Sequence, residues 1–428
     1  MHMKKIIKKI ALLLIVFCIG VGVTLLYTNN KYGVYEKEET KQIKKHVDTI
    51  SMMLETEAKS GNYERTARES WPTEGYVFNT TLSKCENGGE LSWDDEKKVV
   101  LMSGNVSDKC YVYFDVYVPP RFDEICDETT LACHVAKLYT GTQGENGIYY
   151  HDSSLTNGAG DSSYRYSGAN PNNYVCFGSN KSTCPIDNLY RIIGVFENNV
   201  KLIKYDYATS ALLGTDGDYA STGTPNASYY KGSLTTIDIY YWNNSTKKNT
   251  WSESLLNKTN LNTNFINNIG TEWANKIATT TWKVGGNTYA NIRDVIPATA
   301  YQNEIVNPVT TNTTDNATEY SAKIGLMYVS DYGFGADPSA WTTTLYNYDG
   351  SVNGSTIRSL NWMHMGYYEW TISRIADRSN YAFFVSYAGY VNNNYVYNSC
   401  AVRPSFNLES SITYVSGSGS ASDPMVIN

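Results

Sequence analysis

The chain lacks the sequence motifs of common catalytic and nucleotide-binding sites. It contains no P-loop, no G-x-G-x-x-G turn, no H-E-x-x-H helix and no zinc ribbon. The 35 Lys and Arg are outnumbered by 42 Asp and Glu, which gives a net charge of -7. A chain without a basic excess is a poor partner for nucleic acid or for an anionic membrane surface. Its histidines are scattered, and none adjoins a recognisable nucleophile: His2, His46, His134, His151 and His364. We therefore predict a protein that is neither an enzyme nor a nucleic-acid binder.

Tyrosine is the residue type that the chain has in excess, with 37 copies in an Asn-rich background. Tyrosine gives a large amphipathic contact area, and asparagine offers both donors and acceptors of hydrogen bonds without charge. Such side chains form adaptable contact surfaces in binding proteins. The composition therefore favours recognition of a polar neutral ligand, such as a sugar or a protein surface.

The N-terminus predicts a membrane anchor. A basic tail over residues 1–9 precedes an apolar run over 10–27, which is close to the minimum length of a membrane-spanning helix. No small-residue cleavage site follows the run, and Cys18 follows Phe17 rather than the small residue that a lipoprotein site needs. We expect an uncleaved signal anchor, hence a single-pass membrane protein with its C-terminal domain outside the cell.

Cysteine usage fits that compartment, because six cysteines form three couples that are near in sequence. We predict disulfides in chain order, from Cys85 to Cys110, from Cys126 to Cys133 and from Cys176 to Cys184. A metal site at Cys126, Cys133 and His134 is an alternative, although it lacks C-x-x-C spacing. Cys400 stays unpaired.

The residues after the apolar run predict a stalk and a small β module. Ile43, Val47, Ile50 and Leu54 follow the 4-3-4 spacing of one helical face, so a helical stalk is expected over 28–70. The alternating strands that follow predict a disulfide-clipped β module over 71–135.

The rest of the chain predicts a linker and one large domain. Residues 136–173 are rich in Gly, Asn and Tyr with little periodicity, which is typical of a linker. Over 174–428 we expect a hairpin around Asn198, a helix that begins near Trp251 and ends at Gly270, and short strands between turns. The predicted fold class is α+β.

Several segments of the large domain carry a resemblance to a known module. These are RIIGVF, the W-x-x-S-x-L-N helix start, KIGLMYVSDYGF, AVRPSFNL and the final GSGSASDPMVIN. They resemble a C-terminal module of unknown function in surface proteins of gut Gram-positive bacteria. That module is similar to C-type-lectin-like domains of formylglycine-generating enzymes and of the variable proteins of diversity-generating retroelements. The resemblance covers roughly residues 174–428. It implies a lectin-like fold with short twisted strands and one or two helices.

The same resemblance implies limits on chemistry and a prediction about codons. Formylglycine-generating enzymes use a cysteine pair near their C-terminus, where this chain offers only Cys400. Adenine-directed mutagenesis of AAY codons cannot produce Lys, Glu, Gln, Met or Trp, and residues 376–401 contain none of these. We therefore predict a retroelement-diversified window over 376–400. An ordinary Tyr/Asn-rich strand, loop and strand is the alternative.

In the stretch from Trp370 to Leu408, small apolar residues form a framework whose neighbours should face solvent. The framework positions are Ala382, Val385, Gly389, Val391 and Val402. We expect the nearby arginines, Arg374 and Arg403, to pair with buried carboxylates or carbonyls. The predicted ligand-binding residues are Asp377, Arg378, Ser379, Asn380, Tyr381, Phe383, Ser386, Tyr387, Tyr390, Asn392, Asn393, Asn394, Tyr395, Tyr397, Asn398 and Cys400.

The function predicted from these features is a membrane-anchored surface binding protein, or adhesin, for an external protein or glycan. One alternative is a structural or pilus-associated subunit, although a pilin-type leader signature is absent. The other is a secreted glycan hydrolase that would use Glu369 with Asp331. No cofactor is predicted. Calcium is possible through Asp331, Asp337 and Asp349, for which solvated loop carboxylates are the simpler interpretation.

Overall fold

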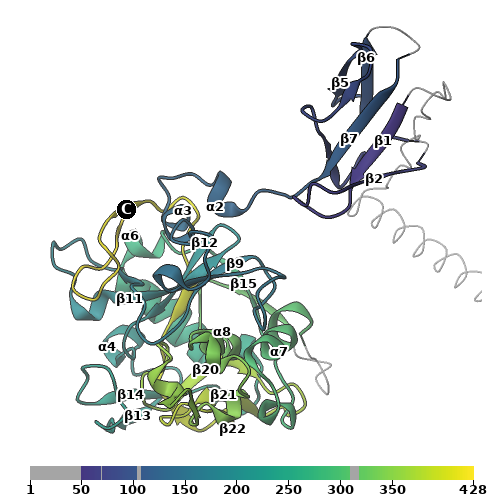
Figure 1. Ribbon diagram of the computed structural model, residues 1–428. Helices are drawn as coiled ribbons and strands as arrows, with labels where there is room; N and C mark the ends of the chain where they lie inside the picture. The colour runs from purple at the N-terminus through teal and green to yellow at the C-terminus, as the bar shows by residue number, and fades with distance from the viewer. Residues whose placement is uncertain (1–49, 69, 104–107, 309–317) are drawn as a thin grey trace, which may run out of the picture. The chain divides into compact units, whose positions relative to one another are not determined.

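The computed structural model describes residues 50–68, 70–103, 108–308 and 318–428, and the chain divides into two compact units between Pro119 and Pro120 (Figure 1). The predicted β module therefore ends at residue 119 and not at 135. The segment from 120 to 135 belongs to the second unit. Each unit has its own apolar core and is described separately.

The first unit is a small β structure. Its main sheet has the order β2-β1-β7-β3, with β4 also paired to β7, and β5 and β6 form a separate hairpin. Its core contains Trp71, Val112 and Phe114. The disulfide between Cys85 and Cys110 joins β4 to β7. The strands are β1 (Ile50–Glu55), β2 (Tyr63–Arg65), β3 (Tyr76–Phe78), β4 (Lys84–Cys85), β5 (Glu90–Asp94), β6 (Val99–Ser103) and β7 (Cys110–Val116).

The prediction of a helical stalk is wrong where the structure describes it. Ile50 and Leu54 lie in strand β1, which pairs in parallel with β7 and antiparallel with β2. A strand with a neighbour on each side and apolar residues on both faces has no period-2 pattern, so its apolar residues also match helical spacing. Ile43 and Val47, the first half of the predicted stripe, lie outside the described residues.

The predicted membrane anchor also needs correction. Among the helices of the described ranges, none is long and apolar enough to cross a membrane. We therefore correct the prediction of a single-pass membrane protein, which the structure does not support. The run over 10–27 on which it depended lies outside the described residues.

The second unit is built on a seven-stranded sheet with the order β17-β24-β12-β11-β9-β8, in which β10 also pairs with β11. The predicted hairpin is confirmed, since β11 and β12 flank a turn that includes Glu197 in the left-handed region, with φ of 57°. The strands of this sheet are β8 (Ile148–His151), β9 (Ser163–Tyr166), β10 (Tyr174–Cys176), β11 (Leu189–Phe196), β12 (Asn199–Lys204), β17 (Ile324–Gly325) and β24 (Ser405–Asn407).

The prediction of a linker over 136–173 is wrong, because this segment supplies β8 and β9 to the main sheet. Tyr150, Tyr164 and Tyr166 fill its core side and are at most 8% exposed. Tyrosine buries a large ring area while keeping a polar hydroxyl. A segment rich in tyrosine and glycine can therefore have the composition of a loop and still form core strands.

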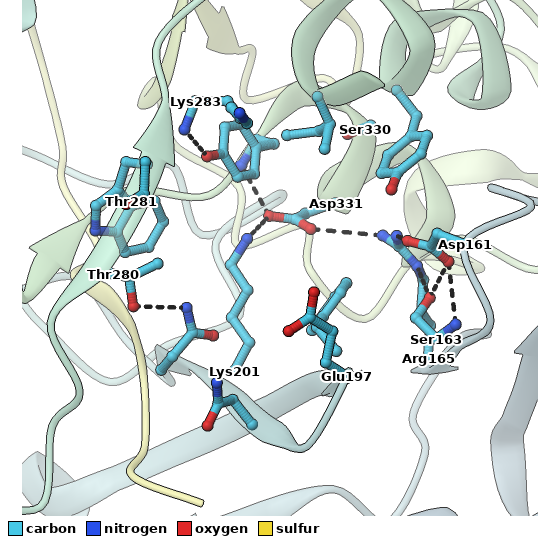
Figure 2. A pocket seen from close by; sticks show the side chains of 17 residues that line it. Asp161, Ser163, Arg165, Glu197, Lys201, Thr280, Thr281, Lys283, Ser330 and Asp331 are labelled. Atoms are coloured by element: carbon cyan, nitrogen blue, oxygen red, sulfur yellow. Dashed lines mark hydrogen bonds and ion pairs between the residues drawn. The ribbon is translucent and has the colours of Figure 1, made fainter. Parts of the chain in front are cut away.

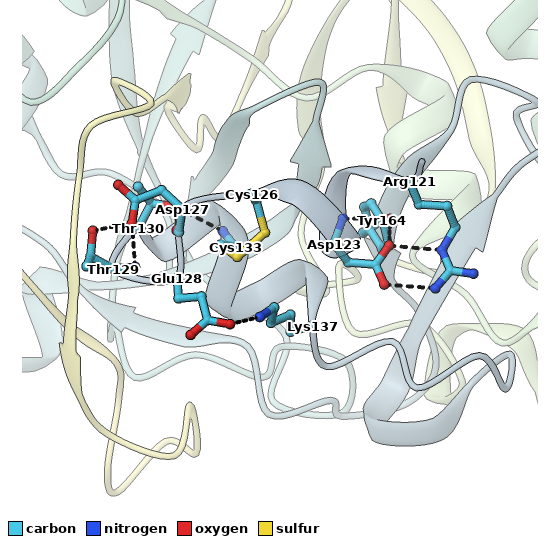
Figure 3. The surroundings of a disulfide bond; sticks show 10 residues. All are labelled: Arg121, Asp123, Cys126, Asp127, Glu128, Thr129, Thr130, Cys133, Lys137 and Tyr164. Atoms are coloured by element: carbon cyan, nitrogen blue, oxygen red, sulfur yellow. Dashed lines mark hydrogen bonds and ion pairs between the residues drawn. A yellow bond between two sulfur atoms is a disulfide. The ribbon is translucent and has the colours of Figure 1, made fainter. Parts of the chain in front are cut away.

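Two short helices, α2 (Phe122–Ile125) and α3 (Leu131–Ala136), precede this sheet and are fixed to it (Figure 3). The Asp123 carboxylate accepts hydrogen bonds from the Arg121 guanidinium and from the hydroxyl of Tyr164 on β9. The Thr130 hydroxyl caps α3 by accepting from the Cys133 N–H at 3.2 Å. These contacts explain why the segment belongs to the second unit.

All three predicted disulfides are present, namely Cys85–Cys110, Cys126–Cys133 and Cys176–Cys184. The alternative of a metal site at the second couple is therefore wrong, because both sulfurs are bonded to each other. His134 instead stacks on Tyr414 with ring centroids 3.6 Å apart.

The helix predicted from Trp251 to Gly270 is confirmed in position, although its middle part of 10 residues is a π-helix. The side-chain amide of Asn262 donates to the Asn257 carbonyl at 3.1 Å and so bonds to the helix's own backbone. Gly270 ends the helix with φ of 79°. The helical segments are η3 (Trp251–Glu253), η4 (Leu256–Phe265), α5 (Ile266–Ile269) and α6 (Thr271–Ala274).

The predicted strand KIGLMYVSDYGF is only partly a strand, because β17 is followed by helix α8 (Val329–Phe334). The fold is mixed α+β, as predicted, with many small sheets and few helices. Three further sheets and one hairpin are β13-β14-β23, β20-β21-β22, β15-β16 and β18-β19. Their bounds are β13 (Tyr219–Gly223), β14 (Ile237–Tyr241), β15 (Thr280–Lys283), β16 (Glu319–Ala322), β18 (Ser351–Val352), β19 (Ser355–Thr356), β20 (Glu369–Arg374), β21 (Tyr381–Val385), β22 (Val391–Tyr395) and β23 (Ser399–Cys400).

Other short elements of the second unit are helices α4 (Ser210–Leu213) and α7 (Pro297–Tyr301), the π-helix η6 (Gln302–Val306), and strands β25 (Tyr414–Ser416) and β26 (Val426–Ile427). The latter two pair with each other near the C-terminus.

Candidate functional site

The predicted recognition segment folds as β21, a tight turn and β22, followed by β23. The framework prediction is confirmed, because Ala382, Val385, Val391 and Val402 are at most 1% exposed and Gly389 is buried. β21 lies between β20 and β22, with Tyr381 opposite Tyr395. The framework therefore fixes a small sheet whose outer strand carries the Tyr and Asn side chains.

All but three of the predicted ligand-binding residues reach the surface fully or in part. Tyr387 and Tyr395, at 36% and 37%, are the most exposed of the tyrosines among them. We call the following set the Tyr/Asn surface: Asp377, Arg378, Ser379, Asn380, Tyr381, Tyr387, Tyr390, Asn392, Asn393, Asn394, Tyr395, Tyr397 and Asn398.

Three predicted residues are corrected, because Phe383, Ser386 and Cys400 are at most 1% exposed. β21 is covered on both faces, so alternation does not bring Phe383 to solvent. The Ser386 hydroxyl accepts from the Ala388 N–H at 3.2 Å and shapes the turn. Cys400 pairs with Tyr240 of β14, and its thiol is inside the core. None of the three can offer its side chain to a surface ligand.

The tyrosines of this surface form a row of rings. Tyr289 meets Tyr381 edge to face at 5.9 Å between centroids, Tyr381 lies 4.3 Å from Tyr395, and Tyr395 stacks on Tyr397 at 4.9 Å. The Arg378 guanidinium lies 4.8 Å from the Tyr289 ring centroid. Sequence reasoning missed Tyr289, which comes from a loop almost 90 residues earlier.

The turn between β21 and β22 is held by the core beneath it. The Tyr332 hydroxyl donates to the Gly389 carbonyl at 2.6 Å, and His364 Nε2 lies 2.9 Å from the Tyr387 carbonyl oxygen. Gly389 has φ of 107°, and an added Cβ would lie 2.9 Å from the Arg358 side chain. Glycine is therefore required at this turn.

The loop that leads into β21 is also anchored by its backbone. The Asn249 amide donates to the carbonyls of Ile375, Arg378 and Tyr381 at 2.6 to 2.9 Å. The Asp377 carboxylate accepts from the Tyr289 N–H at 2.7 Å. The loop and the turn present their side chains from a fixed backbone, which lowers the entropy lost on binding.

The predicted structural roles of Arg374 and Arg403 are confirmed. Arg374 Nε donates to the Val284 carbonyl at 2.8 Å, and Arg403 Nε donates to Glu369 Oε1 at 2.7 Å. Burial raises the pKa of Glu369, which Arg403 opposes. Glu369 is 1% exposed, so the structure gives it no open site in which to act as a hydrolytic acid.

The structure also contains a cavity of about 430 Å³ that sequence reasoning missed (Figure 2). Lys201 of β12 lies at its centre and donates from Nζ to Asp331 Oδ2 at 2.5 Å, and Asp331 belongs to α8. Arg165 of β9 lies on the other side of Asp331, with 3.7 Å between Nη1 and Oδ1, and pairs with Asp161 at 2.5 Å. Trp282 of β15 forms part of the wall.

Burial and pairing set the charges around this cavity. Burial lowers the pKa of Lys201, while Asp331 acts to raise it. Burial acts to raise the pKa of Asp161, but Arg165 and the Ser163 hydroxyl lower it to about 2. A sequence signal was present in Arg165 and Lys201, which are cations inside strands that are otherwise buried.

The carboxylates considered for calcium do not converge. Asp331 is buried in its ion pair, Asp337 accepts from the Ser339 N–H and hydroxyl, and Asp349 is exposed. Over the described ranges, the one group of three potential metal ligands is Cys85, Asp108 and Cys110. Its two cysteines form a disulfide, so they are not available as thiolates.

The comparisons with known proteins give no match. No protein-family model matches the chain, and no similar protein is found among the curated proteins or the solved structures. The resemblance to C-type-lectin-like modules stays a prediction.

Proposed function

We propose that the second unit is a binding domain whose Tyr/Asn surface contacts a polar ligand on an external protein or glycan. The observation that carries this proposal is the row of rings from Tyr289 to Tyr397 on an anchored sheet. Rigid tyrosine side chains contribute much of the binding energy in known interfaces, because they bury a large area at low entropy cost. The three disulfides suit an oxidising compartment outside the cytoplasm.

The chemistry of the surface favours a ligand without a strong charge. Asp377 and Arg378 are its charged side chains, and the Asp377 carboxylate is already engaged by the Tyr289 N–H. Asn392, Asn393 and Asn394 on β22 carry amides that can donate to a ligand, while Asn392 Oδ1 already accepts from Asn393 and Asn394 Oδ1 from Asn398. Stacking on the rings and hydrogen bonds to amides together suit hydroxyl-rich or peptide-like surfaces.

The test is binding of the labelled full-length chain to a glycan array and to an array of surface proteins. We expect specific binding that falls at least about tenfold when Tyr395 and Tyr397 are both changed to Ser, which corresponds to about 1.4 kcal/mol. The matched control is Tyr117→Ser, since Tyr117 is 50% exposed in the first unit. Equal binding by the double variant and the control would contradict the proposal.

The same surface would serve a structural subunit if it joined copies of the chain. Sedimentation velocity of the full-length chain over a range of concentrations separates the two functions. Self-association that disappears on changing Tyr387 and Tyr395 to Ser would favour the subunit. A monomer at all concentrations favours a binding domain.

We further propose that the codons for residues 376–400 are diversified, which rests on the composition of the segment and its exposed side chains. Amplicon sequencing of the segment encoding 360–408 across many isolates tests this. We expect substitutions at adenine positions in codons 376–400 and fixed flanking codons. Changes spread evenly over all four bases would exclude diversification and leave the binding proposal unaffected.

A further inference from the structure

The cavity around Lys201 is lined by equal numbers of opposite charges. Its cations are Arg165, Lys201 and Lys283, and its anions are Asp161, Glu197 and Asp331. Lys283 also pairs with Glu319 beside the cavity. The lining therefore offers strong hydrogen-bonding groups without a net charge that would select an ion.

The two central cations are already paired. Lys201 Nζ contacts Asp331 Oδ2 at 2.5 Å, and Arg165 pairs with Asp161 at 2.5 Å. Lys201 and Arg165 are at most 6% exposed. An ionic ligand would add an unbalanced charge to this buried network, whose cations already have carboxylate partners, and burying a charge without a partner is unfavourable.

A neutral ligand can use the groups that remain free in these pairs. An ammonium has three N–H donors, of which Lys201 gives one to Asp331. Asp331 Oδ1 lies 3.7 Å from Arg165 Nη1, a gap too long for a direct hydrogen bond. Hydroxyl groups both donate and accept, so a polyol can bridge such groups while the pairs stay intact.

The walls between these polar groups are aromatic. Four rings line the cavity: Phe196, Trp282, Tyr301 and Tyr328. Tyr328 also faces Lys201, with 4.4 Å between Nζ and the ring centroid. The cavity's volume of about 430 Å³ is within the range of small-molecule sites, which are mostly apolar with a few converging polar groups. A ligand that carries both hydroxyl groups and C–H faces suits this lining, because the C–H faces pack on the rings and the hydroxyl groups bond to the paired charges.

We propose that this cavity binds one or two rings of a neutral saccharide, separately from the Tyr/Asn surface. No residue of that surface belongs to the lining of the cavity in the described part of the chain. The inference goes beyond the proposed function, because it gives the second unit another site, a pocket instead of an exposed surface.

The experiment is saturation-transfer NMR on the full-length chain with defined probes. The neutral probes are glucose, galactose, N-acetylglucosamine, lactose and cellobiose, and the ionic probes are glucuronate and lysine. The blocking variant is Thr281→Trp, since Thr281 is an exposed residue of the lining. Its matched control is Thr279→Trp, at an exposed position outside the lining. Thermal unfolding of both variants confirms that they fold.

We expect a neutral probe to bind the wild type with millimolar affinity or better. Its affinity for Thr281→Trp should be at least about tenfold weaker, and its affinity for Thr279→Trp should equal that of the wild type. The double variant at Tyr395 and Tyr397 should keep this binding. Three results would overturn the inference: no neutral probe binds, only glucuronate or lysine binds, or binding survives Thr281→Trp. Loss in the double Tyr variant alone would instead place the saccharide on the Tyr/Asn surface.

Discussion

Glu304 gives the sharpest quantitative prediction, because it is a buried acid without a cationic partner in contact. It lies in η6, is 1% exposed, and accepts at Oε2 from the Ser330 N–H at 3.3 Å and from the Ser330 hydroxyl at 3.0 Å. Its Oε1 has no hydrogen-bond partner in the described part of the chain. Burial raises the pKa of Glu304 from 4.5 to about 8. The perturbation is Glu304→Gln, which keeps the shape and removes the ionisation.

The sign and size follow from linkage. The folded pKa of Glu304 lies above its unfolded value of 4.5. Below about pH 4.5 the folded and the unfolded chain both hold this proton, so the free energy of unfolding has its full value there. Between that pH and about pH 8 the unfolded chain has lost this proton and the folded chain still holds it, so stability falls as pH rises. At about 1.4 kcal/mol per pH unit, the loss reaches about 5 kcal/mol above pH 8. That is a large part of the stability of an ordinary domain.

The assay is urea unfolding of the wild type and the Gln variant at pH 5, 6, 7 and 8, followed by tryptophan fluorescence. All the tryptophans except Trp71 and Trp93 lie in the second unit, so the signal reports mainly on it. The variant keeps every other ionisable group of the chain, so the difference between the two proteins reports on Glu304. We expect the wild type to lose more stability toward pH 8 than the variant, by several kcal/mol. Parallel losses in the two proteins would refute the reasoning.

Three other changes test the packing of the second unit. Arg403→Met leaves Glu369 buried without its partner and should lower the free energy of unfolding in urea by about 3–5 kcal/mol. The addition of Glu369→Gln should recover part of this loss. No recovery would argue against the ion pair. Changing Cys126 and Cys133 to Ser opens a short loop and should lower the free energy of unfolding by about 2–3 kcal/mol. No loss in urea unfolding would mean that the hydrogen bonds of α2 and α3 hold the segment alone. Gly286→Ala would place a Cβ 1.7 Å from a backbone carbonyl oxygen, so it should yield little folded protein, and a normal yield would contradict that close contact.

The parts of the fold that sequence reasoning predicted depend on local signals. The disulfides join cysteines that are near in the chain, and the β11–β12 hairpin is closed by a short turn between two apolar runs. Gly389 and its apolar neighbours revealed the framework of β21 and β22, because small residues among Tyr and Asn have few other roles. The structural roles of Arg374 and Arg403 followed from their place inside such motifs.

The errors come from places where two structures share one pattern. β1 was expected to be helical, because apolar residues of a central strand also repeat at helical spacing. β8 and β9 were expected to be a linker, because tyrosine and glycine are common both in loops and in aromatic cores. Phe383 was expected at the surface, because alternation predicts one solvated face, and only the tertiary structure shows that β21 is covered on both.

The cavity could not be predicted because the sequence does not show which side chain pairs with a buried cation. A buried cation is visible in the sequence as Lys or Arg inside an apolar strand, but its partner is not: Asp331 is 130 residues from Lys201. Some buried cations of the core are satisfied by amide oxygens, as Arg191 is by Asn173 Oδ1 at 2.6 Å, and Arg403 meets the buried carboxylate of Glu369. Lys201 instead meets a carboxylate that also borders open volume. A cation in a core strand therefore indicates that a polar contact exists, and only the fold decides whether that contact seals the core or opens into a binding site.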